Sequence, residues 1–136
     1  DIVLGPGYNK SINLDIQKNI KIYNSPSAEN MVRLMLDNDL TITSGGQTLF
    51  EIAKLGLPGI VIKAAENQKT NINFFCSNGL YYAGSWNDEI LRENVLKALK
   101  KLANAKERIK SSKKLKGLID GRGARRVVDK ILTYER

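Results

Sequence analysis

Histidine is absent from this sequence of 136 residues, and its absence narrows the chemistry that the chain can perform. Histidine supplies most general bases that work near neutral pH, and it completes histidine triads and most zinc sites. Sites of these kinds cannot be built from this chain alone. We therefore expect no catalytic residue in the chain, and we expect the isolated chain to be inactive.

Cysteine is almost absent as well, and apolar runs are short. The single cysteine, Cys76, cannot form an internal disulfide, which fits a reducing compartment, and its neighbours Phe74 and Phe75 indicate a packing role. No apolar run approaches the length that spans a membrane, and no signal-peptide pattern is present. We therefore expect a cytoplasmic protein without a transmembrane segment, with peripheral attachment to a membrane as the alternative.

Basic residues outnumber acidic residues by 22 to 14, which gives a net charge of +8. Much of this excess is local, because residues 97–116 hold nine basic residues and a single acid, Glu107. A positive surface attracts anionic partners. However, leucine and valine repeat at helical spacing across residues 91–102, which indicates an amphipathic helix with a solvated basic face. A nucleic-acid groove would interleave aromatic residues, and residues 97–116 contain none, so we expect no nucleic-acid partner.

Short apolar segments alternate with helical patterns along the chain. We expect strands at residues 1–4, 20–23, 40–43, 59–62 and 80–83. The first three helices are expected to begin at Ser11, near Ala28 and after Gly46, and a fourth is expected to contain Ile72. A long helical stretch is expected from Asn87, with a break near Ser111–Ser112. The last helix is expected to contain Val127–Leu132. This alternation predicts an α/β, Rossmann-like three-layer domain with a parallel sheet of about five strands. Because the length suits one domain, residues 1–136 are expected to form a single domain.

The segment Ser44–Glu51 lies at a predicted turn from strand to helix. The N-terminus of a helix presents unpaired N–H groups and a partial positive charge, and glycines let an anion approach the backbone. Glu51 follows on the next turn, where its carboxylate can accept hydrogen bonds from sugar hydroxyls. Together these features predict a bound nucleotide. The alternative is a plain helix start, because Ser44-x-x-Gln47 and Thr48-x-x-Glu51 both have the form of a capping box.

Polar or glycine-rich loops follow several predicted strands. They cover residues 5–9, 25–30, 44–48 and 66–68. Because ligands of parallel α/β sheets bind outside the carboxyl ends of the strands, these loops are expected to line one edge. The first loop begins like a G-x-G-x-x-G fingerprint, but Lys10 stands at the third glycine position, so a plain turn is the alternative interpretation there.

Short motifs in a fixed order connect this sequence with a known family. They are Asn30-Met31, Leu34-Met35, Asp39-Leu40, Gly45-Gly46-x-Thr48-x-x-Glu51, Gly56-x-Pro58, Ala65-Glu66-Asn67-Gln68 and Asp120-Gly121-x-Gly123-Ala124-x-Arg126-Val127. This series resembles the C-terminal half of the UDP-sugar hydrolases of pseudaminic acid biosynthesis. The wider relatives are the GT-B glycosyltransferases, including the N-acetylglucosaminyltransferase of peptidoglycan synthesis.

The resemblance implies that the chain is the C-terminal half of a GT-B type fold and binds the UDP part of a UDP-amino sugar. The reaction would be hydrolysis in the synthesis of cell-surface polysaccharide, such as spore-coat polysaccharide, or of nonulosonic acids such as pseudaminic acid. The alternatives are the donor-binding domain of a UDP-sugar glycosyltransferase and a non-catalytic nucleotide-binding subunit. The family's catalytic histidine belongs to an N-terminal domain. We expect that domain in the same chain or as a separate subunit, because the sequence begins at Asp1 without Met and enters a strand directly.

The resemblance also implies a set of UDP-binding residues. Glu51 would bind the ribose; Gly45, Gly46 and Thr48, with Ser44, would face the pyrophosphate; Ala28 and Met31 would contact uracil; Asn67 and Gln68 would reach the sugar or the phosphates; and Gly5, Gly7 and Tyr8 would close the phosphate side. Backbone N–H groups at a helix start can stabilise the charge of a leaving diphosphate. We therefore expect no metal and no cofactor beyond the UDP-sugar itself.

A dinucleotide-binding domain of a dehydrogenase is a competing interpretation of the same alternation. It predicts an acidic residue at the end of the second strand, which would bind the adenosine ribose. That strand ends in Ile22-Tyr23-Asn24, which disfavours this interpretation.

Overall fold

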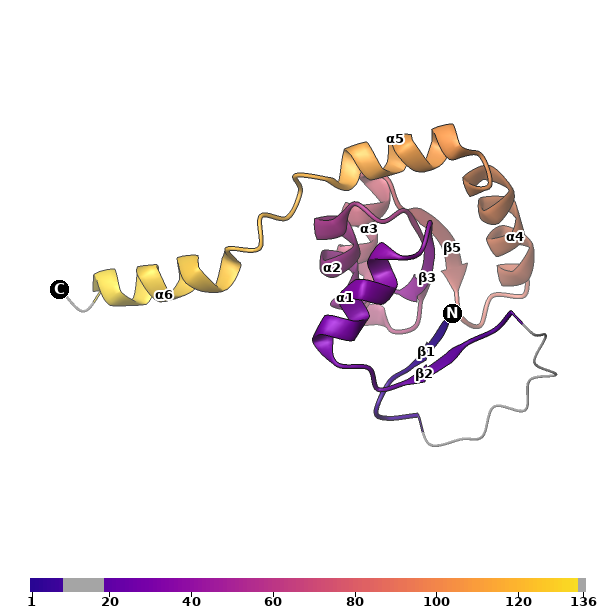
Figure 1. Ribbon diagram of the computed structural model, residues 1–136. Coiled ribbons are helices and arrows are strands. Elements are labelled where there is room, and N and C mark those ends of the chain that lie inside the picture. The colour runs from indigo at the N-terminus through magenta and orange to yellow at the C-terminus, as the bar shows by residue number, and fades with distance from the viewer. Residues whose placement is uncertain (9–18, 135–136) are drawn as a thin grey trace. The chain divides into compact units, whose positions relative to one another are not determined.

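The structure is a computed structural model of the chain, and it describes residues 1–8 and 19–134 (Figure 1). The chain divides into two compact units, Asp1–Asn38 and Asp39–Arg136. The helix that the sequence predicts from Ser11 lies outside the described residues, and so do Asn9 and Lys10 of the first loop.

The first unit contains a parallel pair of strands and one helix. These elements are β1 (Ile2–Leu4), β2 (Ile22–Asn24) and α1 (Ala28–Leu36). In the strand pair, Ile2 lies opposite Ile22. The helix begins where the sequence predicts, because the Ser27 side chain caps it by accepting a hydrogen bond from the Asn30 N–H at 3.2 Å.

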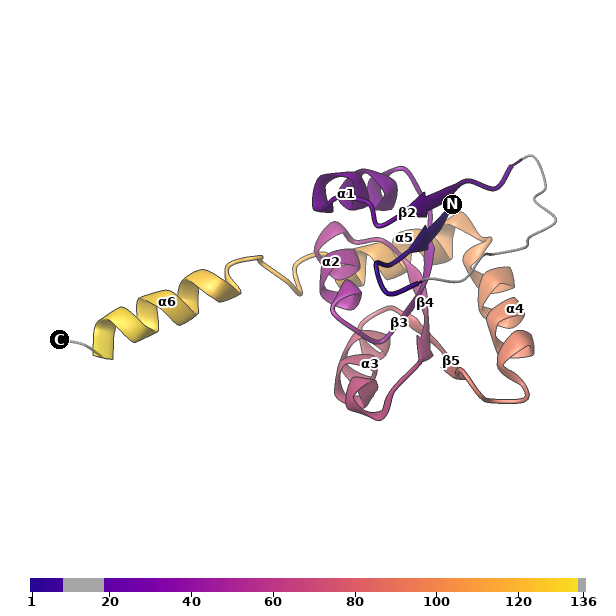
Figure 2. The same cartoon turned by 90° about the horizontal axis from the view of Figure 1, so that it is seen from below.

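The second unit contains a three-stranded parallel sheet and the remaining helices. The strands are β3 (Thr41–Ser44), β4 (Gly59–Lys63) and β5 (Tyr81–Ser85), in the order β3-β4-β5. The helices are α2 (Thr48–Leu55), α3 (Lys69–Ser77) after a 3₁₀ turn η1 (Glu66–Gln68), α4 (Leu91–Leu102), α5 (Ala105–Leu115) and α6 (Gly123–Tyr134). Figure 2 shows α2 and α3 on one side of this sheet and α4 on the other.

Both faces of this sheet are covered by apolar side chains. On the α4 side, Ile60 and Ala83 of the sheet pack with Ala98 and Leu102 of the helix. On the other side, α2 and α3 each bury apolar residues, and Phe75 of α3 is fully buried. Fully burying such a side chain stabilises the fold by about 1.5–3 kcal/mol. Because β4 is covered on both faces, its sequence is a continuous apolar run rather than an alternating one.

Phe75 also fixes how α2 and α3 meet. Its ring lies edge-to-face against Phe50 of α2, with ring centroids 5.0 Å apart, and against Phe74 in the same way at 5.1 Å. Cys76 is half-buried in α3, and this burial raises the pKa of its thiol to about 11. The thiol therefore stays protonated near neutral pH, as the predicted packing role requires.

The described residues confirm the predicted α/β, Rossmann-like class, because the strand pairs within each sheet are parallel and helices cover both faces of the larger sheet. The sequence predicts one sheet of about five strands, whereas the strands of the described residues form a two-stranded and a three-stranded sheet. The second strand begins at Ile22, two residues later than predicted.

The region after β5 differs from the sequence prediction. Helix α4 begins at Leu91 rather than at Asn87. The reason is the turn that precedes it, in which the Asp88 carboxylate accepts a hydrogen bond from the Ser85 N–H at 2.5 Å. This bond holds residues 85–88 in a turn, so Asn87 does not cap a helix.

The predicted helix break near Ser111–Ser112 is also wrong. The break lies at Ala103–Asn104, and the Asn104 side chain caps α5 by accepting a hydrogen bond from the Lys106 N–H at 2.9 Å. Ser111 lies inside α5 and is 3% exposed, and its hydroxyl donates to the Gly79 carbonyl at 2.6 Å. Ser111 therefore links α5 to the Gly79 carbonyl, a tertiary contact that a local sequence pattern does not reveal.

The basic segment behaves as the sequence predicts. Ala98 and Leu102 of α4 are buried, while Lys100 and Lys101 are exposed in its last turn. The basic face is therefore solvated, as expected of an amphipathic helix. Among the described residues, no helix is long and apolar enough to cross a membrane.

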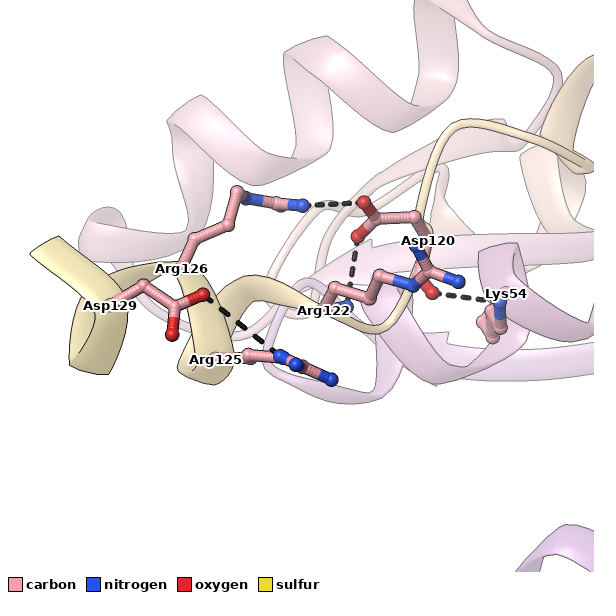
Figure 3. Close-up of polar contacts among 6 residues, drawn as sticks. All are labelled: Lys54, Asp120, Arg122, Arg125, Arg126 and Asp129. Carbon is pink, nitrogen blue, oxygen red and sulfur yellow. Dashed lines mark hydrogen bonds and ion pairs between the residues drawn. The ribbon is translucent and has the colours of Figure 1, made fainter.

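Asp120 organises the segment that leads into α6 (Figure 3). Its carboxylate accepts hydrogen bonds from the Arg126 guanidinium at 2.5 Å and from the Arg122 N–H at 2.9 Å. Its carbonyl accepts one from Lys54 of α2 at 3.1 Å. The Arg126 hydrogen bond, and after it the Arg122 N–H, lowers the pKa of Asp120. The motif Asp120-Gly121-x-Gly123-Ala124-x-Arg126 is thus a local structural device at the start of a helix.

Candidate functional site

The predicted turn from strand to helix is present between β3 and α2. The cap position of α2 is occupied by Gln47, whose side chain makes no capping hydrogen bond. In a capping box that begins at Ser44, the Ser44 hydroxyl would accept a hydrogen bond from the N–H of Gln47. In one that begins at Thr48, the Thr48 hydroxyl would accept from the N–H of Glu51. Among the described residues neither bond forms, so the capping alternative does not explain these side chains.

The backbone of this turn contains N–H groups that can donate hydrogen bonds to a ligand. The N–H groups of Leu49 and Phe50 are used within the turn, donating to the carbonyls of Gly46 and Gln47 at 3.2 and 2.9 Å. Within residues 1–8 and 19–134, no atom accepts a hydrogen bond from the N–H of Gly46, Gln47 or Thr48. Such N–H groups at the positive end of a helix suit an anionic ligand.

The two glycines of the turn are glycine for different reasons. A Cβ on Gly45 would lie 2.5 Å from Cγ1 of Ile72 and 3.0 Å from Cβ of Gln68, so the close approach of α3 requires a glycine there. A Cβ on Gly46 would meet only the Ser44 hydroxyl, at 3.9 Å. Neither glycine has a positive φ angle. The fold therefore explains Gly45, whereas it leaves room for a side chain at Gly46.

Gln68 joins the turn to the end of β4. Its side-chain oxygen accepts hydrogen bonds from the N–H of Gly45 at 3.3 Å and from the N–H of Ala64 at 2.9 Å. Two donors on one oxygen assign the amide orientation, so the side-chain NH₂ remains as a donor. Phosphate oxygens and sugar hydroxyls both accept from such a group. Asn67, the neighbouring residue in η1, is exposed.

Glu51 lies in the first turn of α2, one helical turn after Thr48. Its side chain is exposed, whereas Thr48 is half-buried. No lysine or arginine of the described residues forms an ion pair with Glu51. Its carboxylate is therefore available to accept hydrogen bonds from a ligand.

A charged pair at the end of β4 was not among the predicted site residues. The ammonium of Lys63 lies 2.5 Å from the Glu66 carboxylate. This hydrogen bond raises the pKa of Lys63 and lowers that of Glu66. The position of Lys63 in the sequence could have identified this pair, because Lys63 ends an apolar strand at the edge where ligands of such sheets bind.

The remaining predicted residues lie in the first unit. The loop after β1 is a tight turn, in which the Tyr8 N–H donates to the Gly5 carbonyl at 3.0 Å. Gly5, Gly7 and Tyr8 are exposed. The Ser25 N–H donates to the Leu4 carbonyl at 2.8 Å, which holds the loop after β2 beside the end of β1.

Each unit thus brings a part of the predicted set together at the carboxyl ends of its own strands. The first unit holds Gly5, Gly7 and Tyr8 after β1, and Ala28 and Met31 in α1 after β2. In α1, Ala28 is exposed and Met31 is half-buried. The second unit holds Ser44, Gly45, Gly46, Thr48 and Glu51 after β3, and Asn67 and Gln68 after β4.

The groups around the turn after β3 are suited to an anion rather than to a metal cation. They are backbone N–H groups, an amide NH₂ and a lysine ammonium. Over the described part of the chain, no three His, Cys, Asp or Glu side chains gather closely enough to hold a metal ion. Binding without a metal stays a prediction.

Comparison with known proteins places the chain in a family. Residues 2–125 match the Glycosyltransferase family 28 C-terminal domain. The chain is also similar to the uncharacterized protein MJ1062 of Methanocaldococcus jannaschii, with 45% identity over 62 residues, which are 46% of this chain and 11% of that protein. No solved structure matches the chain. With its parallel strands and flanking helices, the chain belongs to the glycosyltransferase family 28 C-terminal domain family, which has a Rossmann-like, GT-B type fold.

Proposed function

We propose that the chain binds the UDP part of a UDP-amino sugar. The family is one of nucleotide-sugar-binding, glycosyltransferase-like domains. The observation that best supports a nucleotide diphosphate is the turn before α2, where the N–H groups of Gly46, Gln47 and Thr48 have no acceptor among the described residues. Glu51 follows one turn later. This arrangement pairs a donor-rich place for phosphate with a carboxylate for ribose hydroxyls.

The proposed contacts are given for each unit by itself. In the second unit, the N–H groups of Gly46 and Thr48 bind the diphosphate, Glu51 binds the ribose, and the amide NH₂ of Gln68 donates to phosphate or sugar. In the first unit, the Gly5–Tyr8 loop closes the phosphate side, and the start of α1 contacts uracil. Stabilisation of the leaving diphosphate by backbone donors lowers the barrier to its departure without requiring a metal.

We further propose that the reaction is hydrolysis, with water as the acceptor, in the synthesis of cell-surface polysaccharide or nonulosonic acids. The ordered motifs between residues 30 and 68 support this choice, because they resemble the hydrolases of pseudaminic acid biosynthesis. The family match favours a second candidate, transfer of the sugar to another acceptor. In both cases the base lies in an N-terminal partner domain, since this chain has no histidine. The chain spans about a tenth of the length of MJ1062, so the activity of a whole protein is part of this proposal.

Titration calorimetry of the 136-residue chain tests the proposal. UDP is expected to bind more tightly than ADP, NAD or a short duplex DNA at physiological salt. Equal or tighter binding of the duplex would overturn the proposal and would assign the basic face of α4 and α5 to nucleic acid. Equal binding of ADP and UDP would remove the uracil contact from the first unit.

A further inference from the structure

The ion pair of Lys63 and Glu66 lies beside the turn after β3, a position that a solvent-exposed ion pair does not require. In the strand register, Ser44 of β3 lies opposite Ile62 of β4, so the next residues along, Gly45 and Lys63, are neighbours. Adjacent strands lie about 4.8 Å apart. Lys63 therefore stands beside the turn whose N–H groups have no partner among the described residues.

The side chain of Lys63 lies on the same face as that turn. Residues opposite each other on adjacent strands point to the same face of a sheet. At Gly45, that face is the one occupied by Ile72 of α3 and by Gln68. Lys63 reaches the same region, because its ammonium pairs with Glu66 of η1. The hydrogen bonds from Gly45 and Ala64 to Gln68 connect the two strand ends directly.

We propose that Lys63 binds the diphosphate of the ligand. Before the diphosphate binds, the Glu66 carboxylate is the partner of the lysine in its place. This inference rests on the proposed function, since it assigns a further residue to the same site. The exchange is non-covalent: the Lys63 ammonium leaves the Glu66 carboxylate and donates to a phosphate oxygen, and Glu66 turns to solvent.

The exposure of the pair supports such an exchange. The Glu66 side chain is 82% exposed, whereas that of Lys63 is 22% exposed. Glu66 is therefore free to move into water, and an ion pair with one exposed partner is weak. A diphosphate carries more negative charge than a carboxylate and offers several acceptor oxygens, so it displaces Glu66. The lysine is held beside the turn in either state.

The charges around Lys63 agree with its role as a permanent cation. The Glu66 hydrogen bond raises the pKa of Lys63, with smaller contributions from Tyr82 and Asp88. The ammonium therefore stays charged throughout the physiological range. Lys69, at the start of α3, also lowers the pKa of Glu66, so it offers the released carboxylate a nearby cation.

The test compares Lys63→Met and Glu66→Gln with wild type, using titration calorimetry with uridine, UMP and UDP. Lys63→Met is expected to weaken UDP binding about tenfold or more, as for a lost hydrogen bond between charged groups, and to leave uridine binding unchanged. Glu66→Gln is expected to tighten UDP binding about two- to fivefold, because the competing carboxylate is gone. Lys100→Met, in the last turn of α4, removes the same charge elsewhere and is expected to leave all three affinities unchanged. Thermal melts verify that each variant is folded.

The outcomes separate this inference from the proposed function. If wild type binds UDP and Lys63→Met binds it equally well, the role of Lys63 is wrong while the UDP site stands. A loss of UDP affinity in Glu66→Gln makes Glu66 a ligand-binding residue and overturns its role as a competitor. If Lys100→Met weakens UDP binding as much as Lys63→Met does, the effect is general electrostatics and the inference fails. Absence of UDP binding to wild type overturns the proposed function and this inference together.

Discussion

Two glycine-bearing loops, one after β1 and one after β3, are held in very different ways. The loop after β3 is fixed by tertiary contacts, because Gly45 packs against Ile72 and its N–H donates to Gln68. In the loop after β1, no described atom beyond the glycine and its two chain neighbours lies within 4 Å of a Cβ built on Gly5 or Gly7. Glycine is therefore required by packing in one loop and not in the other. The loop after β1 is closed by a backbone hydrogen bond from the Tyr8 N–H to the Gly5 carbonyl, whereas the loop after β3 is held by contacts with α3 and η1.

The largest expected effect is the loss of stability in Gly45→Ala. The added methyl group would overlap Ile72, which is 4% exposed and has little room to move. Overpacking of this kind costs about 1–3 kcal/mol. Urea unfolding measures it, with Gly7→Ala as the matched control, for which we expect a change within about 0.5 kcal/mol. Equal stability changes in the two variants would contradict the contrast between the loops.

The next effect is on affinity, in Glu51→Ala. If this carboxylate binds both ribose hydroxyls, UDP affinity is expected to fall by about 1.5 kcal/mol, the lower end for a bond to a charged group, because the side chain is exposed. Stability is expected to stay within about 0.5 kcal/mol of wild type. Paired melts and UDP titrations measure both quantities.

Deoxyuridine diphosphate is the cross-check for Glu51, because it removes a ribose hydroxyl without altering the protein. Wild type is expected to prefer UDP over the deoxy form, and Glu51→Ala is expected to lose most of that preference. A variant that melts early and still binds UDP like wild type would assign Glu51 to the helix start.

Gly46→Ala is expected to separate ligand approach from packing within a single turn. The fold has room for the methyl group, so the free energy of unfolding should change by less than about 0.5 kcal/mol. UDP affinity should fall about tenfold, because the methyl group keeps the phosphate from the backbone N–H groups. Unchanged UDP affinity would mean that the phosphate does not approach this residue.

The smallest effect is expected from Asp120, which belongs to neither loop. Interactions with Arg126 and Arg122 hold the pKa of this carboxyl below its ordinary value of 3.8. Its stabilising contribution is therefore complete above that ordinary value and is lost as the pH falls through the lowered pKa. Hydrogen-exchange protection at the start of α6, measured relative to an unstructured chain at the same pH, should fall under acid in wild type, while Asp120→Asn should show lower protection already at pH 7. UDP affinity at pH 7 should not change in this variant, and a clear loss would bring the segment into the site.

Local sequence patterns predicted those parts of the fold that depend on local chemistry. Ser27 marks the start of α1 through its own side chain, and the apolar run of β4 marks a buried strand. The error at Asn87 arose from a local turn that Asp88 forms with Ser85, whereas the error at Ser111 arose because a distant residue decides. Ser111 is kept inside α5 by the Gly79 carbonyl, 32 residues away, and no local pattern shows this contact.

The candidate site divides in the same way. The strand-to-helix turn with Gly45 and Glu51 was predicted correctly as a place in the fold, while the ligand contacts of these residues stay predictions. The reason for Gly45 could not be predicted, because it depends on Ile72 in another helix. The bridge through Gln68 and the pair of Lys63 with Glu66 were missed because they depend on how η1 returns over the strand ends.

The shared acceptor on Gln68 has a consequence for local opening. One side-chain oxygen closes the turn after β3 and the end of β4 at the same time. If η1 lifts away, the amides of Gly45 and Ala64 become exposed to solvent in one step, so they should exchange their hydrogens as one cooperative unit. A ligand that holds the NH₂ of the same side chain would slow both exchanges by the same factor. The exchange rate of either amide alone would then show whether the site is occupied.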